Sequence, residues 1–454
     1  MTEPTTAFVL SGGGAKGSFS AGALDFLVRQ AGLVPSIITG TSAGAICASV
    51  LAQARGKEEF YSAAGKLRED ILRMSVRDAA FVKQEWLSGL DGTKAGDDIE
   101  KLIQGKARPP IPPDPSSQKD VLADAAPVTP TLRQGWEDLR SLITNIPAER
   151  RALKNLTKDA RSIMLLDPLE KALRGSTPGV GPSPIDEAAV ARPGLQLRLA
   201  ITALNSGCTR YVTESGALVE RDAMTTAEDG SVPGVIEGLL ASSSVPLVFA
   251  PRPIGSDVYV DGGVLENIPL APAVKLGATD LYIILADPIA CPAPTMDYST
   301  ANLFEVAARA EVTVAFYEQQ RRDMLVTPAS GTTTCLIDPT IMAVSTFETD
   351  AGLLGINMDY GWLRACGETS GLSEQQRAQA HKLADLIVTG RLRAWYLEDG
   401  QGGTGTDHDT ALASAKKLVG DSLASWRGLG LKAPEKADTW ASAPEVHSQP
   451  AASS

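Results

Sequence analysis

Residues 10–24 read LSGGGAKGSFSAGAL, a glycine-rich turn between an apolar run and a segment of helical composition. Taken alone, Gly12-x-Gly14-x-x-Gly17 matches the turn that binds dinucleotides, in which backbone N–H groups and a helix N-terminus face a pyrophosphate. The same geometry would stabilise the oxyanion that forms on an ester carbonyl during acyl transfer. The stretch therefore predicts an anion-binding loop, and the neighbouring sequence has to decide which anion it binds.

The dinucleotide interpretation requires an acidic residue about 20 positions past the glycines, where it would bind the ribose. No acidic residue occurs between Phe26 and Lys57. No Lys-Ser or Lys-Thr pair follows a glycine at the spacing of a Walker-type phosphate loop. The sequence therefore argues against both kinds of nucleotide site.

A second strand-turn-helix pattern supplies the alternative. The apolar run PSIITG precedes TSAGAICASVLAQA, and their junction, Gly40-Thr41-Ser42-Ala43-Gly44, is a GxSxG motif. A serine on such a sharp turn needs glycine on both sides and presents its hydroxyl at the C-terminal edge of the sheet. We therefore interpret Ser42 as a nucleophile and the amides of Gly12, Gly13 and Gly14 as its oxyanion donors. A serine that only caps a helix is the alternative.

The base for this serine is predicted at VYVDGGVLENIP, where Asp261 ends an alternating apolar strand before Gly262 and Gly263. All three histidines, His381, His408 and His447, lie near the C-terminus in helical or low-complexity sequence, which disfavours a Ser–His–Asp triad. Burial would raise the pKa of an aspartate from its usual value of about 3.9 and make it a better base. An ordinary Asp-Gly-Gly turn is the other interpretation of this segment.

Charge and cysteine usage restrict the class of protein. A net charge of −12 argues against a nucleic-acid partner. Five cysteines without a CxxC pair indicate a reducing compartment and support neither a disulfide framework nor a zinc site. The start MTEPTTAFVL lacks the features of a signal peptide, and no apolar run reaches the length of a membrane span. These features predict a cytoplasmic protein.

The alternation of apolar strands with helical segments predicts an α/β fold with a mostly parallel sheet and helices on both faces. We expect residues 5–55 and 195–345 to form the core and residues 56–194 to form a largely helical, Pro-rich insertion that acts as a cap or lid. A helical extension is expected over 346–400. Residues 401–454 have the composition of a low-complexity, partly disordered tail.

Within the insertion, PAERRALKNLTKDARSIMLL has the pattern of a basic amphipathic helix. Its expected apolar face comprises Leu153, Leu156, Ala160 and Ile163, and basic residues surround that face: Arg150, Arg151, Lys154, Lys158 and Arg161. Such a helix could lie on an anionic membrane as a peripheral contact. The alternative is a cap helix that packs on the core and leaves its basic face in solvent.

Four blocks in this order resemble the patatin-like phospholipase family. They are SGGGAKG at 11–17, GTSAG at 40–44, ASSSVP at 241–246, and DGG at 261–263 with NIP just beyond. Each block is weak alone, but the ordered set is specific. Lys16 stands where the family has Arg or Lys, and Gly17, Gly40, Gly44, Gly262 and Gly263 complete the motifs.

The resemblance implies a three-layer α/β/α sandwich that hydrolyses fatty-acyl esters of phospholipids or lysophospholipids without a metal or other cofactor. By the resemblance, Ser42 and Asp261 form a catalytic dyad and Gly12 to Gly14 form the oxyanion hole. Two alternatives stay open: an acyltransferase that uses the same site, and a regulatory scaffold that binds a partner without catalysis. No motif predicts the acyl-chain or head-group preference, or the oligomeric state.

Overall fold

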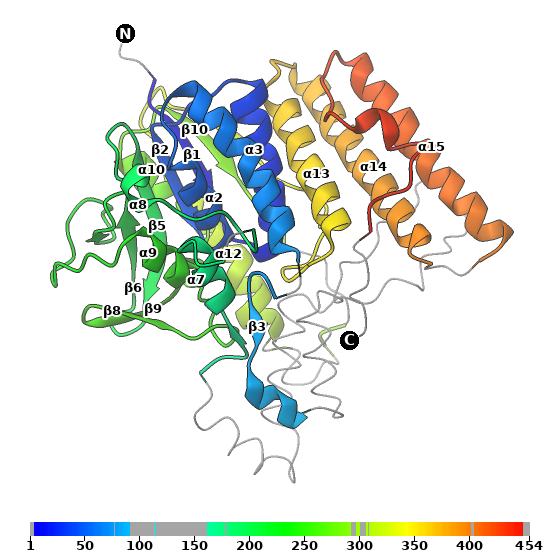
Figure 1. Cartoon of the computed structure of the whole chain (residues 1–454). Helices are drawn as coiled ribbons and strands as arrows, with labels where there is room; N and C mark the ends of the chain where they lie inside the picture. Colours follow the sequence, from blue (N-terminus) through cyan, green and yellow to red (C-terminus); the bar gives the residue numbers. More distant parts are fainter. Residues whose placement is uncertain are drawn as a thin grey trace.

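The computed structural model describes residues 4–90, 161–291, 297–299, 308–400 and 404–447, with Pro113 and Val306 added and residues 77 and 178 excepted. Nine strands in this part of the chain form one mixed sheet, and helices pack around it (Figure 1). The order along the sheet is β11-β10-β1-β2-β5-β6-β7, and β9 joins β5 and β8.

The parallel half of the sheet carries the turns that the motifs predict. Its five strands are β1 (Thr6–Leu10), β2 (Ile37–Thr41), β5 (Gln196–Ala203), β10 (Asp280–Ile284) and β11 (Thr333–Ile337). The antiparallel half adds β6 (Cys208–Thr213), β7 (Leu218–Val219), β8 (Arg252–Ile254) and β9 (Asp257–Asp261). The predicted α/β class with a mostly parallel sheet is therefore confirmed.

Alternation along β1 explains why both faces of the sheet are covered. Phe8 and Leu10 belong to the larger apolar core, whereas Ala7 and Val9 belong to a smaller core on the opposite face. Successive side chains of a strand point to opposite faces, so a strand that is apolar throughout needs a covering layer on each side. α10 (Leu270–Lys275) supplies part of the smaller core.

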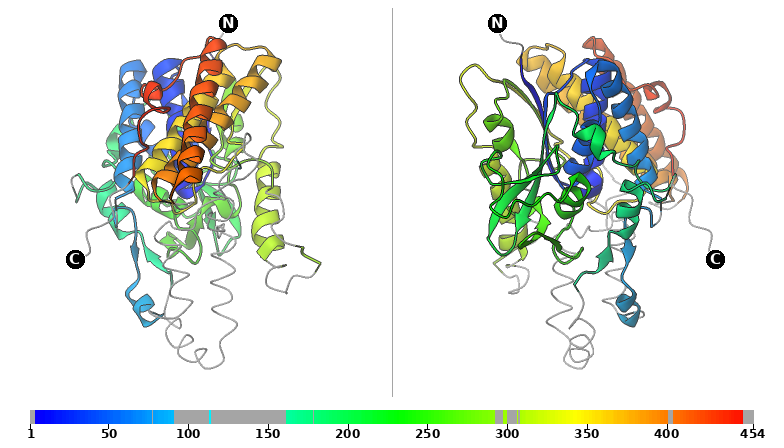
Figure 2. Two further views of the ribbon diagram at one scale, coloured as in Figure 1. Left: turned by 90° about the vertical axis from the view of Figure 1, so that its right-hand side faces the viewer. Right: turned by 60° about the vertical axis from the view of Figure 1, so that its left-hand side comes forward.

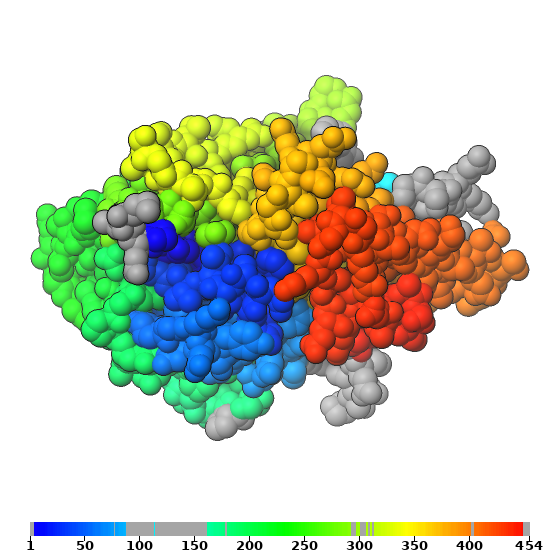
Figure 3. All heavy atoms as spheres, turned by 90° about the horizontal axis from the view of Figure 1, so that it is seen from above, coloured from blue at the N-terminus to red at the C-terminus, as the bar shows by residue number. Residues whose placement is uncertain are grey.

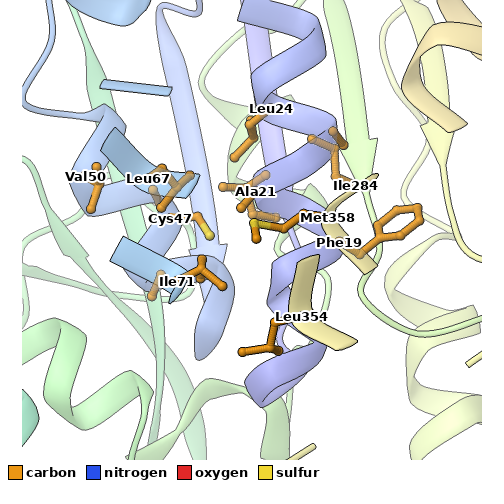
Figure 4. Close-up of a cluster of buried hydrophobic side chains, with 14 of the residues drawn as sticks. Phe19, Ala21, Leu24, Cys47, Val50, Leu67, Ile71, Ile284, Leu354 and Met358 are labelled. Carbon is orange, nitrogen blue, oxygen red and sulfur yellow. The ribbon is translucent and has the colours of Figure 1, made fainter. Parts of the chain in front are cut away.

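The larger core is built around α1 (Gly17–Asp25), which a π-helical turn extends over Phe26–Gln30. Figure 4 shows side chains converging on it from three neighbouring helices: α2 (Ala43–Leu51), α3 (Gly56–Met74) and α13 (Ala351–Thr369). α1 and α13 approach closely because Gly22 faces the Met358 carbonyl and Gly361 faces the Phe19 carbonyl. A Cβ at either glycine would overlap that backbone, so this crossing depends on glycine.

Two long helices continue from α13 on the same side of the sheet. They are α14 (Glu374–Glu398) and α15 (Thr406–Gly428), and α13 lies between them and α3 in Figure 1. The left-hand view of Figure 2 shows α15 in front of the other helices. Figure 3 shows N-terminal residues, in blue, next to C-terminal residues, in orange and red. The remaining helices are α7 (Asp167–Leu173), α8 (Glu187–Val190), α9 (Val235–Ser242), α12 (Ala315–Asp323), and short turns at Gly14–Lys16, Glu85–Leu90, Gly262–Val264, Ala308–Val314 and Ala437–Thr439.

Two segments that composition set apart contribute to the packed structure. α3, at the start of the predicted insertion, packs its buried Leu67 into the larger core. In the predicted tail, Trp426 of α15 and Trp440 are buried in the same core. The last seven residues, 448–454, lie outside the described part of the chain. The proposed domain boundaries stay predictions.

Most of the predicted basic amphipathic helix, including Leu153, Leu156 and Ala160, also lies outside the described residues. At its described end the helix prediction is wrong. Ile163 is buried in a bend, and Met164–Leu165 forms strand β4, which pairs antiparallel with β3 (Val82–Lys83). Backbone pairing with β3 replaces the helical bonds there. Among the described helices, none has the length and apolar character needed to cross a bilayer.

Candidate active site

Ser42 occupies a strained turn between β2 and α2. Its backbone has φ 53° and ψ −120°, a conformation that residues other than glycine rarely adopt. A Cβ on Gly40 would lie 2.5 Å from the Gly44 carbonyl oxygen, and one on Gly44 would overlap the Leu10 carbonyl. Both flanking glycines are therefore required by close backbone approach, and the turn has the strained strand-to-helix geometry that the GxSxG motif predicts.

The register of β5 brings Asp261 to the end of β2. One edge of β5 pairs with β2 up to Ala200, opposite Thr41, and then with β9 from Ile201, opposite Asp261. β6 occupies the other edge of β5. β2 and β9 therefore meet end to end along the same edge, and Ser42 and Asp261, which lie 219 positions apart in sequence, become neighbours.

Burial raises the pKa of the Asp261 carboxyl from 3.8 to about 6, and hydrogen bonding from the Ser42 hydroxyl and the Gly263 N–H partly opposes that rise. The Gly263 N–H donates to Oδ1 at 2.7 Å. Oδ2 is buried and accepts no hydrogen bond of regular geometry from the described residues, although the Ser42 hydroxyl lies beside the carboxyl group. No cation pairs with this carboxylate among those residues. The arrangement leaves a basic oxygen next to a serine hydroxyl.

The glycine loop reaches the same edge, because Leu10 of β1 is in register with Gly40 of β2. The Gly12 N–H donates to the Asn267 carbonyl at 3.2 Å. The N–H groups of Gly13 and Gly14 make no hydrogen bond to any residue in the described part of the chain. Among the described residues, two of the three predicted donors thus have no acceptor, and the first is already paired.

Lys16 holds this loop in place. Its ammonium group forms a buried ion pair with Asp287, which follows β10. The Ala15 N–H donates to the Thr346 carbonyl at 2.8 Å, and the Asn357 side chain donates to the Lys16 carbonyl at 3.3 Å. The motif lysine is therefore placed as a support of the loop. Of the other motif glycines, Gly17 lies against Ala43 and Gly262 against Ala200.

The ASSSVP block is hydrogen-bonded to both Ser42 and Asp261. The Ser42 N–H donates to Ser242 Oγ at 2.9 Å, and the Asp261 N–H donates to the Ser244 carbonyl at 2.9 Å. Sequence reasoning alone assigned no role to these serines. A run of three serines at the end of the apolar helix α9 was the available signal, but it does not say what they bind.

The three histidines have other partners. His381 pairs with Glu368 (Nε2–Oε1 2.5 Å), His408 contacts the Leu397 carbonyl at 3.0 Å, and the His447 ring stacks on Trp395 at 4.8 Å between centroids. None of these contacts involves Ser42 or Asp261. His381 lines a cavity of about 500 Å³ that includes neither dyad residue, with Thr334, Cys335, Leu336, Asp338, Arg364, Glu368 and Arg377. No cluster of metal-ligating side chains occurs among the described residues.

A family model for patatin-like phospholipases matches residues 8–274, which is more than half of the chain. The chain belongs to the patatin-like phospholipase family. Membership makes the protein a carboxylic-ester hydrolase of the lipid acyl hydrolase type. The matched region spans the glycine loop, the Ser42 elbow and Asp261.

Three solved structures are similar to this chain at low identity. VipD from Legionella pneumophila has 15% identity and a TM-score of 0.31, and the match covers 97% of this chain and 91% of that one. The type III effector ExoU has 16% identity and a TM-score of 0.20, with coverages of 96% and 72%. The ExoU–SpcU complex of Pseudomonas aeruginosa has 16% identity and a TM-score of 0.20, with coverages of 93% and 77%. No curated protein sequence matches the chain.

Proposed function

We propose that Ser42 and Asp261 form a catalytic dyad that hydrolyses the fatty-acyl esters of phospholipids or lysophospholipids. One observation carries this proposal: the buried Asp261 carboxyl, which no cation of the described residues neutralises, lies beside the hydroxyl of a serine on a strained turn. Strongly perturbed titratable groups next to a nucleophile are typical of active sites. Family membership indicates hydrolysis of lipid acyl esters, and the dyad would provide the nucleophile and the base for that reaction.

In the first half of the reaction, Ser42 Oγ attacks the ester carbonyl carbon while its proton moves to Asp261 Oδ2. The carbonyl oxygen becomes an oxyanion. When the intermediate collapses, the bond from the carbonyl carbon to the alkoxy oxygen breaks, and protonated Asp261 returns the proton to that oxygen. The lysolipid or glycerol derivative leaves, and the acyl group stays on Ser42.

In the second half, a water molecule attacks the acyl-serine and Asp261 accepts one of its protons. Collapse of this second intermediate breaks the bond to Ser42 Oγ, which regains the proton from Asp261. The fatty acid leaves and the dyad is restored. A pKa of about 6 suits this cycle, because the carboxyl is ionised at neutral pH yet is a stronger base than a solvated aspartate.

The free amides of Gly13 and Gly14 would stabilise both oxyanions. Loss of one such donor typically costs about 3 kcal/mol of transition-state stabilisation. We assign Gly12 a different task from the one that its motif suggests, because its N–H is paired with Asn267. It would fix the loop against the segment that follows Asp261.

We also propose that the protein is cytoplasmic. Its five cysteines are free, which fits a reducing compartment. The basic residues of the insertion, such as Arg150 and Lys154, would add a peripheral contact with anionic lipid.

Labelling with a fluorophosphonate tests the dyad directly. Wild type, Ser42→Ala and Asp261→Asn are treated with the probe, and mass spectrometry maps the adduct. We expect an adduct on Ser42 in wild type, no adduct there in Ser42→Ala, and labelling slowed by at least about 10²-fold in Asp261→Asn, because the base is lost.

Ser49→Ala is the matched control, since Ser49 lies in α2, the helix that directly follows Ser42, and is fully buried. It should label at the wild-type rate. An adduct that persists in Ser42→Ala, or hydrolysis of a lysophospholipid that survives the substitution, would contradict the dyad. Addition of an alcohol acceptor to the same assay would reveal acyl transfer as an ester product in place of free fatty acid.

A further inference from the structure

The carboxamide of Asn267 lies between the two turns that flank Ser42. A Cβ on Gly12 would lie 2.5 Å from Asn267 Oδ1 and 3.2 Å from Ser42 Cβ. The side chains of Asn267 and Ser42 therefore both adjoin the Gly12 α-carbon. A Cβ on Gly263 would lie 3.0 Å from Asn267 Oδ1 and 3.0 Å from Asp261 Oδ1. The amide group is therefore next to the nucleophile and next to the base.

One donor of this amide has no hydrogen-bond partner among the described residues. Asn267 is 3% exposed, and its Nδ2 makes no hydrogen bond within the described part of the chain. Its Oδ1 faces the α-carbons of Gly12 and Gly263, where weak C–H···O contacts suit an oxygen. A buried N–H that lacks an acceptor is costly to the folded protein, and such a group in a native structure needs an explanation.

The backbone on both sides keeps the amide where it is. The N–H groups of Asn267 and Ile268 donate to Asp323 Oδ2 at 2.9 and 3.0 Å, at the end of α12. The Asn267 carbonyl accepts the Gly12 N–H at 3.2 Å, and Gln319 of α12 donates to the Gly263 carbonyl at 3.2 Å. These hydrogen bonds fix the backbone of the segment, and the near-complete burial of Asn267 leaves its side chain little room to turn toward another acceptor.

We propose that Asn267 is a further catalytic residue, whose Nδ2 donates a hydrogen bond to the oxyanion of the tetrahedral intermediate. The proposal rests on the dyad proposed above. It also explains the pairing of Gly12: the Asn267 carbonyl occupies the first amide of the glycine loop, and the Asn267 side chain supplies a donor in its place. Asp323 acts through Asn267 and is a positioning residue.

The test compares ligands that do and do not form an oxyanion. A trifluoromethyl ketone adds to the serine and carries an oxyanion, whereas an ether analogue of a lysophospholipid has no carbonyl. In Asn267→Leu we expect kcat on a soluble acyl ester to fall by about 10²- to 10³-fold, the size of effect seen when one oxyanion donor is lost. KM should change by less than about threefold, because the interaction is made in the transition state. Affinity for the ketone should fall by the same factor as kcat/KM, and affinity for the ether analogue should not change.

Asn357→Leu is the matched control. Asn357 is also 3% exposed and also adjoins the glycine loop, but its Nδ2 already donates to Ser18 Oγ at 2.7 Å and to the Lys16 carbonyl. This variant should change affinity for the ketone and for the ether analogue by the same factor. If Asn267→Leu does not fold, Asn267→Asp replaces it, because aspartate keeps the shape and, when ionised, has no donor.

Two outcomes would overturn the assignment of Asn267. In one, kcat falls while affinity for the ketone is kept, which is the pattern of a structural residue. In the other, neither quantity changes. Failure of the dyad itself is read from wild type, which would then form no adduct with the ketone on Ser42.

Discussion

The sheet edge that holds Ser42 and Asp261 and the C-terminal helices differ in how their buried charges are paired. At the edge, the carboxyl of Asp261 is buried with two hydrogen-bonding neighbours, and no cation among the described residues pairs with it. In the helices, the guanidinium of Arg391 is equally buried but binds Asp359 at 2.8 Å and Glu445 at 2.8 Å, and stacks over the Trp440 ring at 4.1 Å.

The helical network also joins distant parts of the chain. Asp359 of α13 accepts from Arg68 of α3 as well as from Arg391 of α14. Glu445 belongs to the segment after α15. A charge that is removed from water is tolerated when opposite charges and hydrogen bonds compensate for the loss of solvation. This region therefore fixes three helices and the C-terminal segment to one another.

The comparison separates two uses of burial. Burial by itself would lower the pKa of Arg391, but the Glu445 and Asp359 carboxylates outweigh it and raise the pKa, so that the charge is kept. Burial raises the pKa of Asp261, so that its charged form is less stable. The first arrangement supports structure. The second leaves a carboxylate that gains by taking a proton, which is what a general base needs.

The largest effect on stability is expected from Arg391→Met. The substitution leaves the Glu445 carboxylate buried without its partner, and loss of one partner of a buried pair typically costs about 3–5 kcal/mol. Denaturant unfolding should report this loss as a lower midpoint. Activity per folded molecule should stay at the wild-type level, and a fall in that activity would contradict the division between the two regions.

A smaller effect of opposite sign is expected from Asp261→Asn at pH 7. The folded-state pKa of about 6 lies above the ordinary 3.8, so ionisation of Asp261 destabilises the folded protein. This cost is absent below about pH 4, accumulates between pH 4 and 6, and is constant above. At its full extent it corresponds to about 3 kcal/mol. The variant should therefore have a higher denaturant midpoint of unfolding than wild type at pH 7, and the two midpoints should coincide at pH 4.

Asp257 is the control at the other end of β9. Burial works to raise the pKa of Asp257, but hydrogen bonds from Asn205, Ser206 and Val258 outweigh it and lower the pKa overall. Its ionised form stabilises the fold, and that stability is lost only as the pH falls below the ordinary range of an aspartate. Asp257→Asn should therefore destabilise the protein at pH 7. If both variants changed the stability at pH 7 by the same amount, burial alone would determine the effect of each carboxylate, and its hydrogen-bond partners would not.

The smallest effect is expected from Arg427→Met. Arg427 pairs with Asp438, but their side chains are 46% and 78% exposed, and pairs in solvent contribute about 0–1 kcal/mol. The midpoint of unfolding should stay close to that of wild type. A loss as large as that of Arg391→Met would mean that the number of ion pairs, and not their burial, stabilises the helices.

The sequence by itself was sufficient for the fold class and for the residues of the candidate dyad. Apolar runs of the right length predicted the parallel strands, and the turns at Gly12 and Ser42 had to emerge at one edge because parallel strands end there together. The scarcity of histidine directed attention to Asp261 as the base. Each of these inferences depends on local pattern or composition, which the sequence contains directly.

Only the tertiary structure decided which groups are paired. The Gly12 N–H is occupied by the Asn267 carbonyl, the Ser42 N–H binds Ser242, and Asp323 holds the segment after Asp261. The sequence also suggested a helix through Ile163, where pairing with β3 produces a strand. Hydrogen bonds between residues that lie far apart in sequence depend on how closely loops and strands approach. The packing of the whole core sets how closely these segments approach, and this cannot be predicted from the local periodicity of the sequence.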